Sequence, residues 1–161
     1  MIEQFSKIFD GLQAAYGTYK INGRDTKGKA TGKATVVKES RTTETWEAHL
    51  SGQQSIGIIP INEDNECKWG CIDIDEYNFD HQKLLKQLQN AKLPLVVCRS
   101  KSGGAHVFLF TTEFIPAKDM QETLKRLAVS LGYGSCEIFP KQIVLHLERG
   151  DVGNFLNTPY F

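Results

Sequence analysis

The stretch CKWGCIDIDEY, residues 67–77, predicts the first strand of a small sheet, and the rest of the chain can be ordered around it. The stretch is apolar and β-branched, with Asp73 and Asp75 two residues apart. Because side chains of a strand alternate between its two faces, both carboxylates project from one face, and Ile72 and Ile74 project from the other. The pattern predicts a strand over residues 68–76 whose isoleucine side packs on helices and whose aspartate side carries chemistry.

The segments after this strand alternate regularly. We expect a helix over 79–91, a strand over 94–100, a Ser-Lys-Ser-Gly-Gly turn, a strand over 105–112, a helix over 117–131 that stops at Gly132, and a last strand in CEIFP, residues 136–140. The order βαββαβ is that of the ferredoxin-like or RNA-recognition-motif (RRM-like) class. In that class the sheet order is fourth, first, third and second strand. The expected fold class is therefore α+β, with an RRM-like catalytic core in residues 67–161.

Residues 1–66 are expected to form an N-terminal α/β lobe of the same single domain. Apolar residues at helical spacing predict a helix over 2–16, and a Gly/Lys-rich turn divides 17–42 into two strands. A threonine cap predicts a short helix over 43–50. The segment SIGIIPI, residues 55–61, is expected to be a strand.

Composition excludes several classes of protein. The 161 residues are 40% hydrophobic and 24% charged, which is ordinary for a globular chain and excludes disordered and fibrous classes. No apolar run approaches the roughly 18 residues of a membrane span. The N-terminal segment lacks the basic start and continuous apolar core of a secretion signal. We therefore expect a cytoplasmic location and no membrane partner.

The formal net charge is zero, but positive charge gathers in residues 20–41, which hold seven Lys and Arg residues against two acidic residues. This segment is either a solvated hairpin or a flap that contacts phosphates. Cys67 and Cys71 are four residues apart in a predicted strand, so roughly 13 Å separates them, too far for two ligands of one zinc ion. With Cys98 and Cys136 they are expected to be reduced structural thiols.

Three acidic residues and one histidine meet in the expected sheet. If the first strand lies between the third and fourth, then Asp73 and Asp75 lie beside His106 and Glu137, on the face that no helix covers. Three carboxylates repel one another unless a cation lies among them, and Mg²⁺ or Mn²⁺ prefers such oxygen ligands. The expected metal ligands and catalytic residues are Asp73, Asp75 and Glu137, and two ions would stabilise the attacking and leaving oxygens of a phosphoryl displacement. The alternative is that Asp73 and Asp75 are merely solvated.

A triphosphate site is expected next to these acids. In SKSGGAH, residues 100–106, paired glycines let backbone amides approach an anion closely. The candidate nucleotide contacts are Arg99, Lys101, Ser102, Gly103, Gly104, His106 and Lys141. Taken singly, Gly-Gly is also an ordinary hairpin turn, a lone histidine is more often structural, and Lys141 could be a surface lysine.

The motifs IDID, SGGAH and EIFPKQ, preceded by HLSGQQSIGIIPI and followed by GNFLNTPYF, make residues 49–161 resemble a known family. The chain resembles the archaeo-eukaryotic primase (AEP) superfamily and, within it, the primase-polymerases (PrimPol) of phages and of TOTE conflict systems. This resemblance implies that Asp73, Asp75 and Glu137 bind catalytic metals and that His106 contacts the phosphates of the incoming nucleotide. The family often has serine two positions before that histidine, where this chain has Gly104, so Ser102 or a backbone amide would take the role.

The resemblance also implies a reaction. Nucleotides from NTP or dNTP would be joined on a single-stranded DNA template during DNA replication, in a bacterial, archaeal or phage-infected cell. A helicase or an accessory domain outside this chain would be a further partner. The expected function is therefore a template-dependent nucleotidyltransferase: a DNA primase, a DNA polymerase, or both.

Two alternatives stay open. The first is a non-catalytic single-stranded nucleic-acid-binding module of the same fold, in which aromatic rings stack on bases: Trp69, Phe108, Phe110 and Phe139. Acids among these rings argue against it, because acids repel phosphates, and we expect the rings to pack beneath the N-terminal lobe. The second is a metal-dependent nuclease, which keeps the metal and hydrolyses a phosphodiester.

Overall fold

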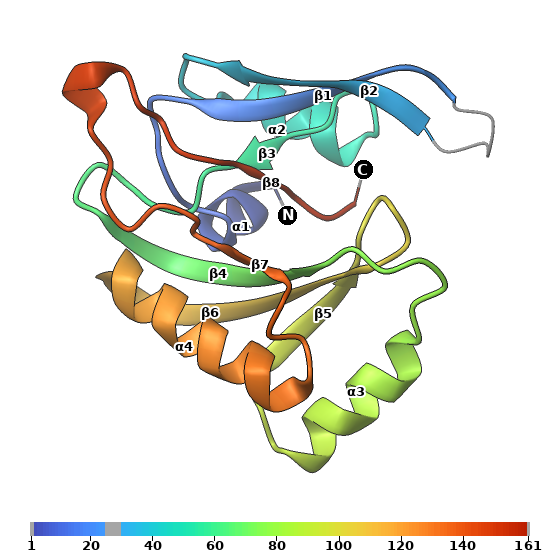
Figure 1. Ribbon diagram of the computed structural model, residues 1–161. Coiled ribbons are helices and arrows are strands. Elements are labelled where there is room, and N and C mark those ends of the chain that lie inside the picture. The colour runs from blue at the N-terminus through green and yellow to red at the C-terminus, as the bar shows by residue number, and fades with distance from the viewer. Residues whose placement is uncertain (1, 25–29, 161) are drawn as a thin grey trace.

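The computed structural model describes residues 2–24 and 30–160, which form two four-stranded antiparallel sheets with helices around them (Figure 1). The helices are α1 (Ile2–Ile8), α2 (Thr43–Leu50), α3 (His81–Asn90), α4 (Ala117–Leu131) and the short 3-10 helix η1 (Leu147–Arg149). The strands are β1 (Tyr16–Arg24), β2 (Ala30–Val37), β3 (Gly57–Ile58), β4 (Glu66–Ile74), β5 (Leu95–Arg99), β6 (Ala105–Pro116), β7 (Glu137–Phe139) and β8 (Leu156–Asn157).

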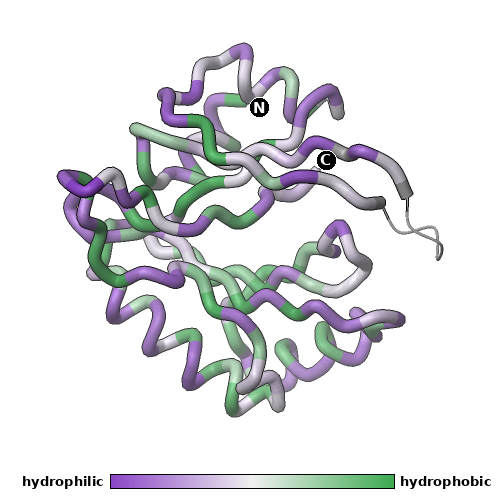
Figure 2. The backbone as a smooth tube through the Cα atoms, turned by 45° about the horizontal axis from the view of Figure 1, so that its top comes forward, coloured by the Kyte–Doolittle hydropathy of each residue, from purple (hydrophilic) through white to green (hydrophobic). Residues whose placement is uncertain are grey.

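The second sheet is built around β4 and has the strand order β5-β6-β4-β7. This is the neighbour order expected from the sequence. Helices α3 and α4 cover the lower face of this sheet (Figure 1). The aliphatic core fills the space between them, with Ile72 and Ile74 of β4, Leu84 of α3 and Leu124 of α4 all fully buried. Figure 2 shows both helices alternating between hydrophilic and hydrophobic residues, as amphipathic helices do.

The first sheet has the order β2-β1-β3-β8, so both ends of the chain contribute strands to it. Helix α1 lies between this sheet and the upper face of β4 (Figure 1). The division of the domain into a lobe of residues 1–66 and a module of residues 67–161 stays a prediction, and β8 joins the sheet that most of the first segment builds.

The aromatic core separates the two sheets. Trp69, Phe108 and Phe139 of the second sheet are 0%, 1% and 4% exposed and pack with Phe9 and Trp46 of the N-terminal region. The expectation that these three rings pack beneath the N-terminal segment is confirmed. Phe110 is half-buried at the edge of the same core. Rings that are covered in this way are not available to stack on bases.

Local signals predicted several elements well. Helix α4 spans residues 117–131 as expected, and Gly132 ends it in the left-handed conformation with φ 87°. Helix α2 also matches its expected bounds, and the Thr42 hydroxyl caps it by accepting from Thr45 N at 3.3 Å. Both helices are set by residues at their own ends.

The predicted helix over 2–16 is wrong beyond Ile8. After α1 the backbone leaves the helical path to bond with distant segments: Leu12 N donates to Ile59 O at 3.0 Å, and Trp69 Nε1 donates to Asp10 O at 2.6 Å. Leu12 and Tyr16 are buried as their spacing suggested, but from an irregular segment and from β1. Tertiary hydrogen bonds override the local helical pattern here.

Two strand predictions also need correction. Of the segment 55–61, only Gly57 and Ile58 form a strand. Ile56, Ile58, Ile59 and Ile61 are all fully buried, so this segment packs on both sides instead of alternating. Strand β6 continues to Pro116, beyond the expected residue 112.

The basic segment folds as the expected hairpin, because β1 and β2 pair antiparallel along their length. Lys27 and Lys29 lie outside the described residues. Arg41 is structural, since its Nη1 donates to Leu12 O at 2.6 Å and burial lowers the pKa of its guanidinium. No helix within residues 2–24 and 30–160 combines the length and the apolar character that crossing a membrane requires.

Candidate active site

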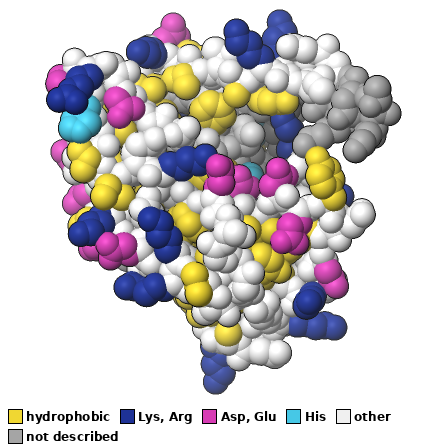
Figure 3. All heavy atoms as spheres, in the orientation of Figure 1, with side chains coloured by type: hydrophobic (Ala, Val, Ile, Leu, Met, Phe, Trp, Pro, Cys, Tyr) yellow, Lys and Arg dark blue, Asp and Glu magenta, His cyan; other side chains and the backbone are white. Residues whose placement is uncertain are grey.

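Asp73 is the centre of the candidate site, because strand register places the other candidates on both sides of it. Its Cα partner on β6 is His106, and its Cα partner on β7 is Glu137. Directly paired residues of an antiparallel sheet point to the same face. Figure 3 shows acidic side chains gathered at the rim of a hollow between the two sheets, with a basic side chain beside them. The expected grouping of these three residues on one face is therefore present.

The carboxylate of Asp73 lies against the imidazole of His106. Asp73 Oδ1 is 3.4 Å from His106 Nε2, and the two side chains are 24% and 10% exposed. The His106 ring also packs edge-on against Phe108, with ring centroids 5.8 Å apart. The aromatic core therefore fixes the ring of His106, and His106 in turn faces the carboxylate at the edge of that core.

Glu137 and Lys141 form an ion pair at the more exposed side of the site. Lys141 Nζ is 2.7 Å from Glu137 Oε2, and the two side chains are 32% and 62% exposed. The same ammonium group lies 5.1 Å from the centroid of the Phe139 ring. Lys141 is thus paired with Glu137, and no sequence motif predicted this ion pair.

Asp75 lies outside the strand that was expected to carry it. Strand β4 ends at Ile74, and Asp75 is exposed in the loop that follows. Among residues 2–24 and 30–160, no group of three or more His, Cys, Asp or Glu side chains is close enough to hold a metal ion. By chemistry and register, carboxylates on β4, its following loop and β7 fit a hard divalent cation. As placed, one of them is turned towards a lysine, so the donors do not converge on one point.

The Ser-Lys-Ser-Gly-Gly turn presses against the end of β4. A Cβ atom on Gly104 would lie 1.9 Å from Ile74 O, so only glycine allows this approach. Gly103 has φ 96°, and its amide donates to Ser100 O at 3.0 Å. That amide is occupied by the turn itself, and an anion contact from the rest of the turn stays a prediction. Ser102 Oγ is likewise 3.0 Å from Ser100 Oγ.

A small polar cavity brings several candidate phosphate contacts together. Its volume is about 40 Å³, and its lining includes Arg99, Lys101 and His106 on the side of the second sheet. On the side of the first sheet the lining includes Tyr19, Ser55, Asn157 and Thr158. The Lys101 ammonium lies over the ring of Tyr19, which links the two sides. Lys141 does not line this cavity.

Sequence reasoning missed the residues of the first sheet in this cavity. Tyr19 stands in YGTYK, and Asn157 and Thr158 stand in GNFLNTPYF; both stretches belong to the family resemblance, without assigned roles. The only signal was therefore the resemblance itself. Their convergence depends on the pairing of β8 with β3, which the sequence did not predict.

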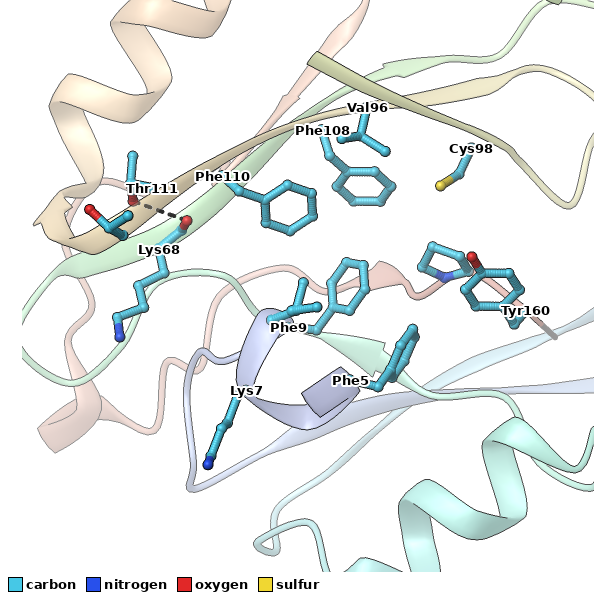
Figure 4. Close-up of a pocket in the computed structure, with 13 residues that line it drawn as sticks. Phe5, Lys7, Phe9, Lys68, Val96, Cys98, Phe108, Phe110, Thr111 and Tyr160 are labelled. Atoms are coloured by element: carbon cyan, nitrogen blue, oxygen red, sulfur yellow. Dashed lines mark hydrogen bonds between the residues drawn. The ribbon is translucent and has the colours of Figure 1, made fainter. Parts of the chain in front are cut away.

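A larger apolar cavity of about 590 Å³ adjoins the polar one and shares Pro159 and Tyr160 with it. Figure 4 shows Phe5 and Phe9 facing Phe108 and Phe110 across this space. Lys7 and Lys68 line the same cavity (Figure 4). Asp73, Asp75 and Glu137 do not line this cavity. The larger of the two cavities therefore lies beside the candidate active site.

The four cysteines are free thiols. Burial raises the pKa of Cys67 to about 12, and burial together with the charge of Asp73 raises the pKa of Cys71 well above its ordinary value. Burial also raises the pKa of Cys98, the strand partner of His106. A thiol held in its protonated form is a poor nucleophile, so these cysteines are structural residues.

The model of the family described as "TOTE conflict system, Archaeo-Eukaryotic Primase domain" matches residues 3–160. No curated protein sequence matches the chain.

Proposed function

The chain belongs to the archaeo-eukaryotic primase domain family of TOTE conflict systems, and from this premise we propose that it is a template-dependent nucleotidyltransferase, a primase, a polymerase or both. Such an enzyme joins nucleotides from NTP or dNTP into a strand. The observation that carries the proposal is the register that puts Asp73 between His106 and Glu137. The proposal includes an RRM-like core, which the element order from β4 to β7 and the strand order of the second sheet support.

Asp73, Asp75 and Glu137 are the residues that would hold Mg²⁺ or Mn²⁺. When bound, such ions would supply charge neutralisation at the reacting phosphate. Asp73 is fixed for this role by the strand and by His106, 3.4 Å away. Glu137 needs to turn from Lys141 to join it, and an exposed ion pair resists that movement by only about 0–1 kcal/mol.

The triphosphate would rest between the two sheets. Arg99, Lys101 and His106 line one wall of the polar cavity and present positive charge and hydrogen-bond donors. In the reaction, a 3′-hydroxyl attacks the α-phosphate and pyrophosphate leaves. The chain's own residues act by holding the triphosphate in position relative to Asp73, which is catalysis by orientation and charge.

Single-stranded DNA template is proposed to contact the β1/β2 hairpin. Lys20 and Lys33 are register partners in this hairpin, and both are exposed. Like charges directly opposite each other destabilise a sheet, and a phosphate lying between them would relieve this repulsion. Template binding would then weaken as salt concentration rises. A helicase or an accessory domain is proposed as a further partner, on the strength of the family alone.

The test is incubation of the chain with a labelled primer on a DNA template, nucleoside triphosphates and Mn²⁺, and in parallel with template alone. Lengthening of the primer, or new strands on the template, is the expected result. Shortening of the labelled strand would support a nuclease instead. A labelled strand that is bound but unchanged in length would overturn the proposal in favour of a binding module.

A further inference from the structure

Asn157 presents a buried acceptor without a partner. Among the residues that the structure describes, its Oδ1 is the one buried side-chain nitrogen or oxygen atom that makes no hydrogen bond. Buried polar groups are nearly always paired, and an unpaired acceptor is unfavourable. Asn157 is also a lining residue of the polar cavity between the sheets. The residue that carries the unpaired oxygen therefore lines a candidate ligand site.

The backbone that carries Asn157 is held in place on both sides. Asn157 pairs with Gly57 in the first sheet, and the next residue, Thr158, donates from its amide to Ile56 O at 2.9 Å. The Thr158 hydroxyl donates to the same carbonyl at 2.8 Å, and His49 Nε2 is 2.8 Å from Pro159 O. Because these bonds fix the strand, the backbone position from which the Asn157 side chain reaches the cavity is set.

Neighbouring polar groups of the cavity already have partners. Ser55 Oγ donates to Tyr19 O at 3.0 Å and accepts from Tyr19 N at 2.9 Å. The Thr158 hydroxyl is bonded as described above. Ser55 and Thr158 therefore complete their own sheet, whereas Asn157 keeps an oxygen for a group that enters from outside.

The size and the opposite wall of the cavity indicate which group that is. A volume of about 40 Å³ suits a small polar group such as one hydroxyl. The opposite wall carries Arg99, Lys101 and His106, the proposed triphosphate contacts. In a nucleotide, the hydroxyls of the pentose are the hydrogen-bond donors nearest to the phosphates.

We propose that this cavity is the pentose subsite of the nucleotide site and that Asn157 is a specificity-determining residue that accepts a hydrogen bond from a pentose hydroxyl. The proposal rests on the proposed function, because it takes a nucleoside triphosphate as the ligand. It assigns to β8 a contact with the sugar that no motif marked. Asn157 would then favour nucleotides that carry this pentose hydroxyl over nucleotides that lack it.

The test measures the Kd values of ATP, dATP and 2′,3′-dideoxy-ATP, with inorganic tripolyphosphate as a sugar-free probe, for the wild-type chain and for Asn157→Ala. We expect the substitution to weaken ATP binding about 3- to 10-fold, the worth of one hydrogen bond, and to leave dideoxy-ATP and tripolyphosphate unchanged. If the substitution weakens dATP binding as much as ATP binding, the contact is the 3′-hydroxyl. If it leaves dATP binding unchanged, as for dideoxy-ATP, the contact is the 2′-hydroxyl.

Two further variants keep the result interpretable. Asn157→Asp retains an acceptor oxygen and is expected to keep the preference for ATP over dideoxy-ATP. Asn90→Ala removes an exposed amide at the end of α3, outside the cavity, and should change no Kd. Unchanged tripolyphosphate binding in Asn157→Ala shows that the site is still folded.

An Asn157→Ala chain with the wild-type ratio of ATP to dideoxy-ATP affinity would overturn the inference. If the wild-type chain still synthesised strands in that case, only the inference about Asn157 would be wrong, and the proposed function would be unaffected. A wild-type chain that binds none of the four probes would overturn both.

Discussion

The two ends of strand β4 differ although they share one face of the sheet. At Trp69 and Cys71 this face is sealed beneath α1 and the first sheet, and both side chains are fully buried. At Asp73, two residues further on, the side chain is 24% exposed and faces His106 and Glu137. The first sheet therefore covers only part of the second. The same strand therefore supplies core at one end and candidate chemistry at the other.

The largest expected effect is at the open end. Asp73→Asn keeps the size of the side chain and removes its charge, so strand synthesis should fall by about 10³-fold, since the site loses a carboxylate needed at the reacting phosphate. The free energy of unfolding should change by less than about 1 kcal/mol, because the side chain is partly exposed. Primer extension and urea unfolding measure the two effects. Asp119→Asn, at an exposed position of α4, is the matched control. Synthesis above a tenth of wild type in the Asp73 variant would contradict this.

The sealed end should show the opposite behaviour. Trp69→Ala removes a fully buried ring and its 2.6 Å hydrogen bond to Asp10 O, so it should lower the free energy of unfolding by about 3–5 kcal/mol. Urea denaturation gives the value. Tyr77→Ala, at a side chain that is 69% exposed, should cost much less, about 0.5 kcal/mol. Equal costs at the two positions would mean that the first sheet does not seal this end.

The buried thiol of Cys67, in the aliphatic core, makes the stability of the fold sensitive to alkaline pH. The pKa of Cys67 is raised by burial from 9.0 to about 12, so the folded state holds a proton that the unfolded state releases above pH 9. The stabilisation is complete below pH 9 and is lost as pH rises towards 12; at pH 10 this thiol alone lowers the free energy of unfolding by about 1.4 kcal/mol.

Cys67→Val isolates this contribution, because it keeps an apolar side chain and has no thiol to titrate. Urea unfolding at pH 8 and pH 10 should show a smaller loss of stability in the variant than in the wild type. Equal losses in the two chains would rule out Cys67 as the source.

The smallest expected effect on stability lies at the exposed rim. Lys141→Gln breaks the ion pair with Glu137, and because both side chains are partly exposed, the free energy of unfolding should change by less than about 0.5 kcal/mol. Strand synthesis should fall by about 10-fold, since Lys141 is a candidate phosphate contact. Lys118→Gln breaks a comparable surface pair with Glu122 and should leave synthesis unchanged. A loss of several kcal/mol in Lys141→Gln would place this residue with the sealed end.

Much of the second sheet could be predicted because its signals are local or periodic. The alternation of Asp73 with Ile72 and Ile74 defines the two faces of β4, and Gly132 ends α4 whatever surrounds it. The N-terminal segment was harder. Leu12 has helical spacing and is buried, but its amide bonds to Ile59, 47 positions away in the chain, and no local pattern carries that information.

The candidate site divides in the same way. The side-by-side placement of Asp73, His106 and Glu137 followed from strand order and from the period of two. The ion pair of Lys141 with Glu137 and the engaged amide of Gly103 depend on side-chain and turn geometry that sequence spacing does not determine.

Alternation, caps and motifs are properties of neighbouring residues, so the amino-acid sequence alone predicts the faces of β4, the order of elements from β4 to β7 and the family. The packing of the two sheets adds that the first sheet covers the aromatic part of β4, that the acids lie at its rim and that Asn157 lines one cavity with Arg99, Lys101 and His106. The physical reason is that these contacts join segments about 50 to 140 residues apart, whose meeting depends on how two sheets pack and not on any local preference.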